Sequence, residues 1–307
     1  MSDYLELTFN IGTRELYYVA NNIRKEYTKT EIKKKNGGTR TIYMPSRRLK
    51  YIQRMMLDNV LTEYKVSGCA TAYHNGAKLI NNATPHLNKK YLLKLDIEDF
   101  FPSIEFGRVY KMFCTIFTKP YAKLYAELCC YDDHLVQGAP TSPAISNIIM
   151  RDFDNALEKW CKERNIAYTR YCDDITLSSD EPLNSVYYFV KHLLYKNGFE
   201  LNRKKTHFVK NTHRQIVTGI VVNEKAQVSR DYRRKLRQDL YYLHKFGAED
   251  VIRKNNLTEF IDGSFICDEE YVRSLAGKIN YILQIDPGND EFIAEKGKIE
   301  KYIYANY

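Results

Sequence analysis

The chain has 307 residues, of which 44% are hydrophobic and 28% charged, and its formal net charge is +9. This length allows one large or two ordinary domains, and the composition is that of a globular protein rather than a disordered or fibrous one. The N-terminus lacks a basic segment followed by an apolar one, and no apolar run could span a bilayer. We therefore expect a cytoplasmic protein with no membrane partner.

The seven cysteines are an odd number and form no CxxC pair, which favours reduced thiols over a disulfide framework or a zinc site. The positive charge indicates a polyanionic partner, although an ordinary lysine-rich surface is the alternative. The 26 tyrosines, interleaved with Lys and Arg, suit stacking on bases, although most of them should pack in the core.

The predicted elements follow from hydrophobic spacing and turn residues. In chain order they are helices within residues 1–30, a basic β-hairpin over 31–44, a helix over 46–64, a strand over 91–97, helices over 106–117 and 121–131, a tight loop over 137–143, a helix over 144–164, a hairpin around 171–174, a helix over 183–197, strands near 201 and over 215–222, and a helical tail from 229. Strands alternating with helices, with hairpins among them, predict an α+β fold with an antiparallel sheet backed by helices.

The most informative segment is Tyr171-Cys172-Asp173-Asp174, which lies between two runs rich in aromatic and β-branched residues. These runs predict two short strands joined at a tip that carries two adjacent carboxylates. Adjacent carboxylates repel each other, and a pair of Mg²⁺ ions would offset that repulsion. An acidic β-turn without chemistry is the alternative, because Asp is a common turn residue.

Asp96 ends the predicted buried strand over residues 91–97. If the fold brings this strand beside the acidic hairpin, three carboxylates form a cluster that two metal ions about 3.5–4 Å apart could bridge. One ion would activate an attacking hydroxyl, and the other would neutralise a leaving pyrophosphate. The alternative for Asp96 is a helix or turn cap.

Three motifs occur in the order and spacing of the palm of a reverse transcriptase: LDIEDFFPS at residues 95–103, QGAPTSP at 137–143 and YCDD at 171–174. The chain also resembles the retron branch of that family. Its NATPH segment at residues 82–86 is similar to that branch's NAxxH element, and VTG at 217–219 to its VTG element. The resemblance covers roughly Thr39 to Asn223. Cys172 is a departure, because many members carry Ala there, and its thiol could be a site of oxidation.

The resemblance implies a right-hand polymerase of fingers, palm and thumb. Residues 1–90 would form N-terminal helices and fingers, residues 91–224 a palm with interleaved finger helices, and residues 225–307 a helical thumb.

The resemblance also implies roles for individual residues in nucleotide addition. Two Mg²⁺ ions would lie at Asp96, Ile97, Asp173 and Asp174. Lys205 would protonate the leaving pyrophosphate, with Lys204 as the alternative. Phe101 would exclude a ribose 2′-OH, although one ring of Phe100-Phe101 should be core. Gln137 and Gly138 would place the templating base and the incoming nucleotide, and Arg40 on the basic hairpin would hold the triphosphate.

The two retron-like elements imply recognition of a structured RNA by Asn82, His86, Thr218 and Gly219. Asn82 and His86 could equally cap a helix or satisfy buried backbone groups. His86 is not expected to bind a metal, because no second His or Cys lies at ligand spacing.

The helix expected after Ser229 carries two stripes. Ser229 is a good N-cap residue. One stripe is apolar and consists of Tyr232, Leu236, Leu240 and Leu243, and the other is basic and consists of Arg230, Arg233, Arg234 and Arg237. This pattern fits a thumb helix gripping duplex phosphates, with a solvated charged face as the alternative.

The expected activity is RNA-directed DNA synthesis from deoxynucleoside triphosphates. By resemblance to retrons, the enzyme would copy its cognate non-coding RNA into a branched RNA-linked single-stranded DNA (msDNA), primed from a guanosine 2′-OH. We expect template removal by a separate enzyme, and anti-phage defence with a separate effector protein. The alternatives are a generic or group II intron-like reverse transcriptase, and an RNA–DNA-binding scaffold or antitoxin.

Overall fold

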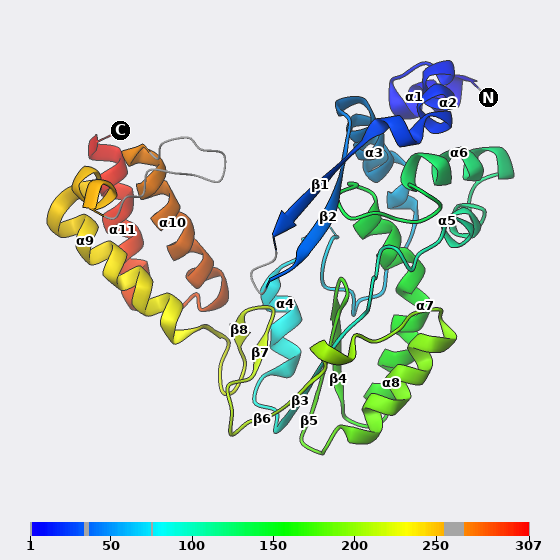
Figure 1. The fold of residues 1–307 in the computed structure, drawn as a ribbon. Helices are drawn as coiled ribbons and strands as arrows, with labels where there is room; N and C mark the ends of the chain where they lie inside the picture. The colour runs from blue at the N-terminus through cyan, green and yellow to red at the C-terminus, as the bar shows by residue number, and fades with distance from the viewer. Residues whose placement is uncertain (1, 34–36, 75, 255–266, 307) are drawn as a thin grey trace. The chain divides into compact units, whose positions relative to one another are not determined.

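A computed structural model describes residues 2–33, 37–74, 76–254 and 267–306 of the chain (Figure 1). The chain divides into two compact units. The first comprises Met1–Lys78 and Lys90–Phe208, and the second comprises Leu79–Lys89 and Val209–Tyr307. This division joins a short segment before the palm to the C-terminal part of the chain, and the assignment of fingers, palm and thumb to residue ranges stays a prediction.

The first unit contains most of the sheet and the longest helix of the predicted palm. Its elements are α1 (Ser2–Phe9), α2 (Thr13–Asn21), η1 (Ile23–Glu26), β1 (Tyr27–Lys33), β2 (Thr39–Pro45), α3 (Arg47–Asn59), η2 (Leu61–Glu63), β3 (Tyr91–Asp96), α5 (Phe106–Phe113), α6 (Lys119–Cys129), α7 (Ser142–Lys162), β4 (Ala167–Tyr171), β5 (Asp174–Ser179), α8 (Asn184–Lys196), η4 (Arg203–Lys205) and the start of β6 (His207–Lys210).

A four-stranded sheet in the order β4-β5-β3-β6 forms the centre of this unit, and β5 pairs antiparallel with both β4 and β3. Helix α7 contacts β4 and α8, and these two helices cover one face of the sheet (Figure 1). The inward side of α7 buries Ile145, Phe153, Leu157 and Cys161, which recur at helical spacing. The predicted antiparallel sheet backed by helices is confirmed.

Local sequence signals explain several boundaries. The Ser46 side chain accepts a hydrogen bond from the Leu49 amide at 3.1 Å, which caps α3 as N-cap serines do. The basic hairpin pairs Tyr27 with Pro45 through to Lys33 with Thr39. Gly37 and Gly38, immediately before Thr39, have φ of 85° and 80°, a conformation that glycine tolerates best. Residues 34–36 of this predicted hairpin lie outside the described residues.

Some element predictions were wrong. Residues 27–30 belong to β1 rather than to the helical start, because Tyr27, Thr28 and Thr30 favour a strand and the segment pairs along β2. Leu201 forms only a single antiparallel bridge, to Ile97, since the chain turns at once into η4. Strand β6 and the two-residue strand β9 (Gln227–Val228) were not predicted.

The second unit is smaller and mostly helical. It contains α4 (Leu79–Ala83), η3 (Thr84–His86), the strands β7 (Ile216–Val217), β8 (Ile220–Val221) and β9, and the helices α9 (Arg230–Lys254), α10 (Asp268–Ile285) and α11 (Asp290–Asn306). Leu236, Leu240 and Leu243 of α9 are buried, as the apolar stripe predicted. The helical tail is confirmed for the described residues, and its residues 255–266 lie outside them. In the described part of the chain, no helix combines the length and apolar character needed to cross a membrane.

Candidate active site

The acidic tetrapeptide forms the tip of the β4–β5 hairpin. Tyr171 pairs with Asp174, so that Cys172 and Asp173 make a two-residue turn. Cys172 has a φ of 60°, a left-handed conformation that costs free energy for any residue with a Cβ. On the other side of β5, Asp174 pairs directly with Asp96 at the end of β3. The sheet register therefore brings the carboxyl-bearing residues of two distant motifs together.

Three contacts extend this arrangement beyond the hairpin. The Ile97 amide donates a 3.0 Å hydrogen bond to the Asp173 carbonyl, which joins the turn to the end of β3. The Asn202 amide donates to the Asp96 carbonyl at 2.8 Å, and the Asn202 side chain caps η4 by accepting from the Lys204 amide at 3.2 Å. This turn places Lys205, whose Nζ donates to both Asp96 oxygens at 2.9 and 2.8 Å.

The electrostatics of the site favour positive charge. Restricted hydration of the carboxyl group, together with the charges of Asp173 and Asp96, raises the pKa of Asp174 to about 6. Burial also raises the pKa of Asp96, against the hydrogen bond from Lys205. The same hydrogen bond raises the pKa of Lys205, so its ammonium group stays charged. Lys205 thus supplies the counter-charge to the acidic residues.

The donor set of this site suits a hard cation, since it consists of carboxylate oxygens in an environment that disfavours their negative charge. The Asp96 carboxylate forms an ion pair with Lys205 in this structure. Among the described residues, no group of three or more His, Cys, Asp or Glu side chains lies ready to hold a metal ion. The three acidic residues fit Mg²⁺ by the chemistry of their oxygen donors and by their shared location in one cleft.

A cleft of about 850 Å³ opens over these residues. Its lining includes most of the predicted substrate residues: Arg40, Phe101 and Gln137, together with Asp96, Asp173, Asp174 and Lys205. Both rings line the cleft; Phe100 is buried, whereas Phe101 is only half-buried and is the more accessible of the two, and its role toward the ribose stays a prediction. The Tyr43 amide donates to the Gln137 carbonyl at 2.8 Å, so the basic hairpin is joined to the loop that carries Gly138.

The family profile described as Reverse transcriptase (RNA-dependent DNA polymerase) matches residues 32–229, which include every residue named in this cleft. The chain belongs to the reverse transcriptase family. It is therefore an RNA-directed DNA polymerase, and the predicted family membership and enzyme class are confirmed.

Retron enzymes are among the relatives of this reverse transcriptase. The retron Ec86 reverse transcriptase of Escherichia coli is 32% identical over 81% of this chain and 78% of that protein. The retron Mx65 reverse transcriptase of Myxococcus xanthus is 30% identical over 89% of this chain and 65% of its own length. A solved telomerase from Candida albicans, in complex with a fragment of telomeric RNA, superposes with a TM-score of 0.50 at 11% identity over 95% of this chain and 66% of that one. This likeness supports the fold alone.

Asn202 and Tyr73 are among the cleft residues of this reverse transcriptase that sequence reasoning missed. Asn202 lies beside the predicted lysine motif, and its role at the start of η4 becomes visible only once η4 is seen. Tyr73 has a φ of 58°, and its ring lies 6.2 Å from that of Tyr171.

Cys172 is buried, and burial raises the pKa of its thiol to about 12, which disfavours the reactive thiolate and argues against the suggested oxidation.

The two retron-like elements meet in the second unit. The Asn82 side chain donates to the Thr218 hydroxyl at 3.4 Å, and the Asn88 amide donates to the Val222 carbonyl at 3.0 Å. Asn82 is 1% exposed and His86 0% exposed, whereas Gly219 follows Thr218 in a tight turn with φ of 85°. Both side chains thus lie inside this unit, and the Asn82 side chain joins the two elements through the Thr218 hydroxyl. Contact of these residues with RNA stays a prediction.

The four arginines of the basic stripe on α9 differ in how available their guanidinium groups are to bind phosphate. Arg230 and Arg234 are exposed, whereas Arg233 is half-buried and donates to Gln227 at 3.0 Å. Arg237 forms a bidentate ion pair with Glu291 of α11 at 2.5 and 2.6 Å. The predicted basic stripe exists, although Arg237 is neutralised by Glu291 and Arg234 lies 3.7 Å from a carboxylate oxygen of Asp231. Its binding of nucleic acid stays a prediction.

Proposed function

We propose that this reverse transcriptase is a retron enzyme, which copies a cognate structured non-coding RNA into RNA-linked single-stranded DNA. The observation that carries the catalytic part is the direct pairing of Asp96 with Asp174, beside Asp173 at the turn and Lys205 on Asp96. The retron part rests on the sequence likeness to retron enzymes and on the meeting of the NAxxH and VTG elements.

Asp96, Asp173, Asp174 and the backbone of Ile97 are the residues that would hold two Mg²⁺ ions. When bound, these ions supply Lewis-acid activation of the attacking hydroxyl and neutralisation of the leaving pyrophosphate. The protein's own part is to keep these oxygen donors together against their mutual repulsion. It does so through the β3–β5 register and the Ile97-to-Asp173 hydrogen bond.

The remaining cleft residues act on the nucleotide. Lys205 has a protonated ammonium group within reach of the acidic residues, and we assign to it proton donation to the leaving pyrophosphate. Lys204 is the weaker candidate, because only Lys205 bonds to Asp96 and lines the cleft. Arg40 would bind the triphosphate, and Phe101 would occupy the space of a ribose 2′-OH. Gln137 and Gly138 would support the templating base.

The proposed substrates and partners follow from the retron assignment. The template and primer are one RNA, with synthesis starting from a guanosine 2′-OH, and the product is msDNA. The basic stripe of α9 would bind the phosphates of that RNA and of its hybrid. We further propose that the complex acts in anti-phage defence with an effector on a separate chain.

The decisive experiment expresses the chain with its neighbouring non-coding RNA and extracts the nucleic acid. The extract is treated with ribonuclease and with a debranching enzyme. We expect an RNA-linked DNA that Asp173→Ala abolishes. Asp152→Ala is a matched control, because this carboxylate on α7 is 82% exposed and lies outside the cleft lining.

Other outcomes separate the alternatives. Activity on a 3′-primed template without any branched product, given the matched RNA, would refute the retron assignment and favour a generic reverse transcriptase. RNA binding without any synthesis would favour a scaffold or antitoxin. Full synthesis by Asp173→Ala would overturn the assignment of the catalytic site.

A further inference from the structure

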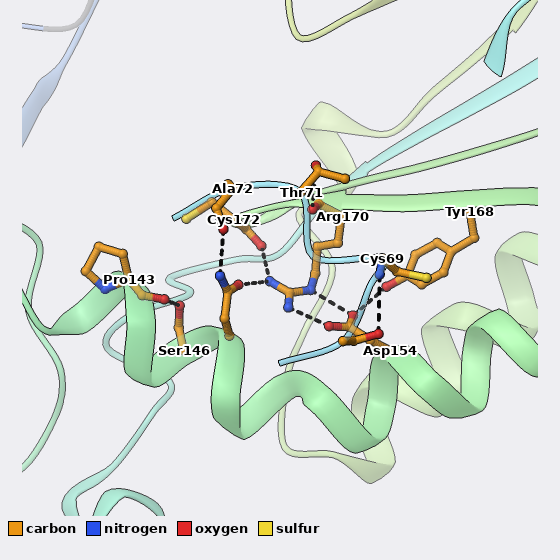
Figure 2. Close-up of polar contacts among 11 residues, drawn as sticks. Cys69, Thr71, Ala72, Pro143, Ser146, Asp154, Tyr168, Arg170 and Cys172 are labelled. Atoms are coloured by element: carbon orange, nitrogen blue, oxygen red, sulfur yellow. Dashed lines mark hydrogen bonds and ion pairs between the residues drawn. The ribbon is translucent and has the colours of Figure 1, made fainter. Parts of the chain in front are cut away.

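A buried charged cluster lies directly behind the acidic turn. It consists of Arg170 on β4 and of Asn147 and Asp154 on α7, and we call it the Arg170 cluster (Figure 2). Arg170 is the largest side chain with almost no exposure, and both it and Asp154 are 0% exposed. Asn147 and Asp154 are seven residues apart, which is two helical turns, so both reach β4 from the same face of α7.

Arg170 uses almost all of its hydrogen-bonding capacity in this cluster. Its Nε and Nη2 donate to the two carboxylate oxygens of Asp154 at 2.8 and 2.6 Å. Its Nη1 donates to the Asn147 side-chain oxygen at 3.1 Å and to the Cys172 carbonyl at 2.9 Å. Four of the five guanidinium N–H groups therefore have partners. The last of these contacts ties the cluster to the catalytic turn (Figure 2).

Stability alone is a weak reason for such a cluster. Taking a guanidinium and a carboxylate out of water costs about as much as their attraction returns, and apolar replacements of similar volume are often neutral or stabilising. What an apolar pair cannot provide is a donor directed at the Cys172 carbonyl. The distinguishing property of the cluster is therefore the geometry that it imposes on the turn.

The backbone around Asp173 is held at two successive carbonyl groups. The Cys172 carbonyl accepts from Arg170, and the Asp173 carbonyl accepts from the Ile97 amide. These carbonyls belong to the two peptide planes that flank Asp173. Because each peptide unit is planar, fixing both planes fixes φ and ψ of Asp173, and with them the direction of its Cα–Cβ bond. The first plane also follows Cys172, whose positive φ would relax without a restraint.

We propose that Arg170 is a positioning residue of this polymerase: held by Asp154 and Asn147, it fixes the Cys172 carbonyl and thereby directs the Asp173 carboxylate into the cleft. The proposal rests on the catalytic role proposed for Asp173. It assigns a function in the reaction to a residue that is buried and does not line the cleft.

The test must separate positioning from folding, because Arg170→Met alone leaves Asp154 charged and unpaired in the core. The triple variant Arg170→Met/Asp154→Leu/Tyr168→Phe avoids this, since Tyr168 Oη donates to Asp154 at 2.6 Å and would otherwise lose its acceptor. The matched control is Tyr168→Phe, which removes that one hydrogen bond and keeps every contact of Arg170.

The measurements use the full chain, an RNA template annealed to a DNA primer, and one complementary dNTP. We expect the triple variant to lower kcat about 100-fold, as a misdirected catalytic group does, while the KM for the nucleotide stays within about 3-fold. Tyr168→Phe should retain wild-type kcat. A second readout is independent of activity: hydrogen exchange at the Ile97 amide should accelerate in the triple variant and not in the control.

Several outcomes would overturn the proposal. A folded triple variant with wild-type kcat and unchanged Ile97 exchange would do so. If the triple variant does not fold, Arg170→Lys decides, because one ammonium group can pair with Asp154 but cannot also reach the Cys172 carbonyl. Wild-type kcat in folded Arg170→Lys would refute positioning. Activity of Asp173→Ala would instead refute the proposed catalytic site, so the two failures are distinguishable.

Discussion

Gly138 gives a sharp test of how the nucleotide site is assembled. Its φ is 116°, and a Cβ at this position would lie 2.3 Å from the Tyr43 carbonyl oxygen and 3.0 Å from Ile42 Cγ2. The first of these contacts is with backbone that cannot rotate away. Gly138→Ala must therefore separate the loop from β2 and break the hydrogen bond from the Tyr43 amide to the Gln137 carbonyl.

The expected cost can be worked out from these contacts. The strained backbone costs about 1–3 kcal/mol for a residue with a Cβ, and the lost hydrogen bond about 1 kcal/mol. We expect Gly138→Ala to lower the free energy of unfolding by about 3 kcal/mol in total. The nucleotide KM should rise as well, because Arg40 on β2 moves away from the acidic residues.

Urea unfolding followed by circular dichroism measures the stability, and single-nucleotide addition measures KM. Gly107→Ala is the control, because its Cβ would meet nothing within 4 Å and it lies in α5. That change should alter the free energy of unfolding by no more than about 1 kcal/mol. A Gly138→Ala enzyme with wild-type stability and KM would show that the loop and the hairpin do not depend on each other.

Three further perturbations address other parts of the chain. Burial lowers the pKa of His86 to about 3, so on acidification the unfolded state binds a proton before the folded state does. The free energy of unfolding should therefore fall below about pH 6.5, by up to about 1.4 kcal/mol per pH unit. Urea unfolding measures this slope, which should be less steep in His86→Gln. Glu291→Gln frees Arg237, and the slope of log affinity for RNA against log salt should steepen, whereas Arg237→Ala should not steepen it. Lys205→Ala should lower kcat about 100-fold or more in single-nucleotide addition. The free energy of unfolding should change by no more than about 1 kcal/mol, because this side chain is 54% exposed. An equal loss of kcat in Lys204→Ala would contradict the assignment of the proton donor.

The parts of the site that sequence could predict are those encoded locally. Strand-forming residues around two adjacent acids predicted the hairpin tip, and a buried strand ending on Asp96 predicted its partner. Both signals depend on residue spacing within a few positions. The register that places Asp96 opposite Asp174 is not local: the order of the family's motifs implied that these residues share a site, and the pairing itself is seen only in the structure.

The parts that sequence could not predict join distant segments through buried polar groups. In the sequence, Arg170 is an ordinary strand residue beside the motif, and Asp154 is one of many charged residues on its helix. Nothing in either local pattern says that the two are buried together. Asn82 and Thr218 pose the same problem across 136 positions, since neither local pattern predicts that buried Asn82 bonds to the Thr218 hydroxyl.

The acidic turn illustrates why such buried support is needed. Its residues combine a left-handed Cys172 with carboxyl groups whose environment opposes their charge, as the raised pKa of Asp174 records. Each of these features lowers stability, and a turn free to relax would move toward a conformation with less repulsion. Bonds from Ile97 on one side and Arg170 on the other leave it no such freedom. The unfavourable arrangement of charge persists because rigid neighbours hold the backbone, and that arrangement is what a bound cation would complement.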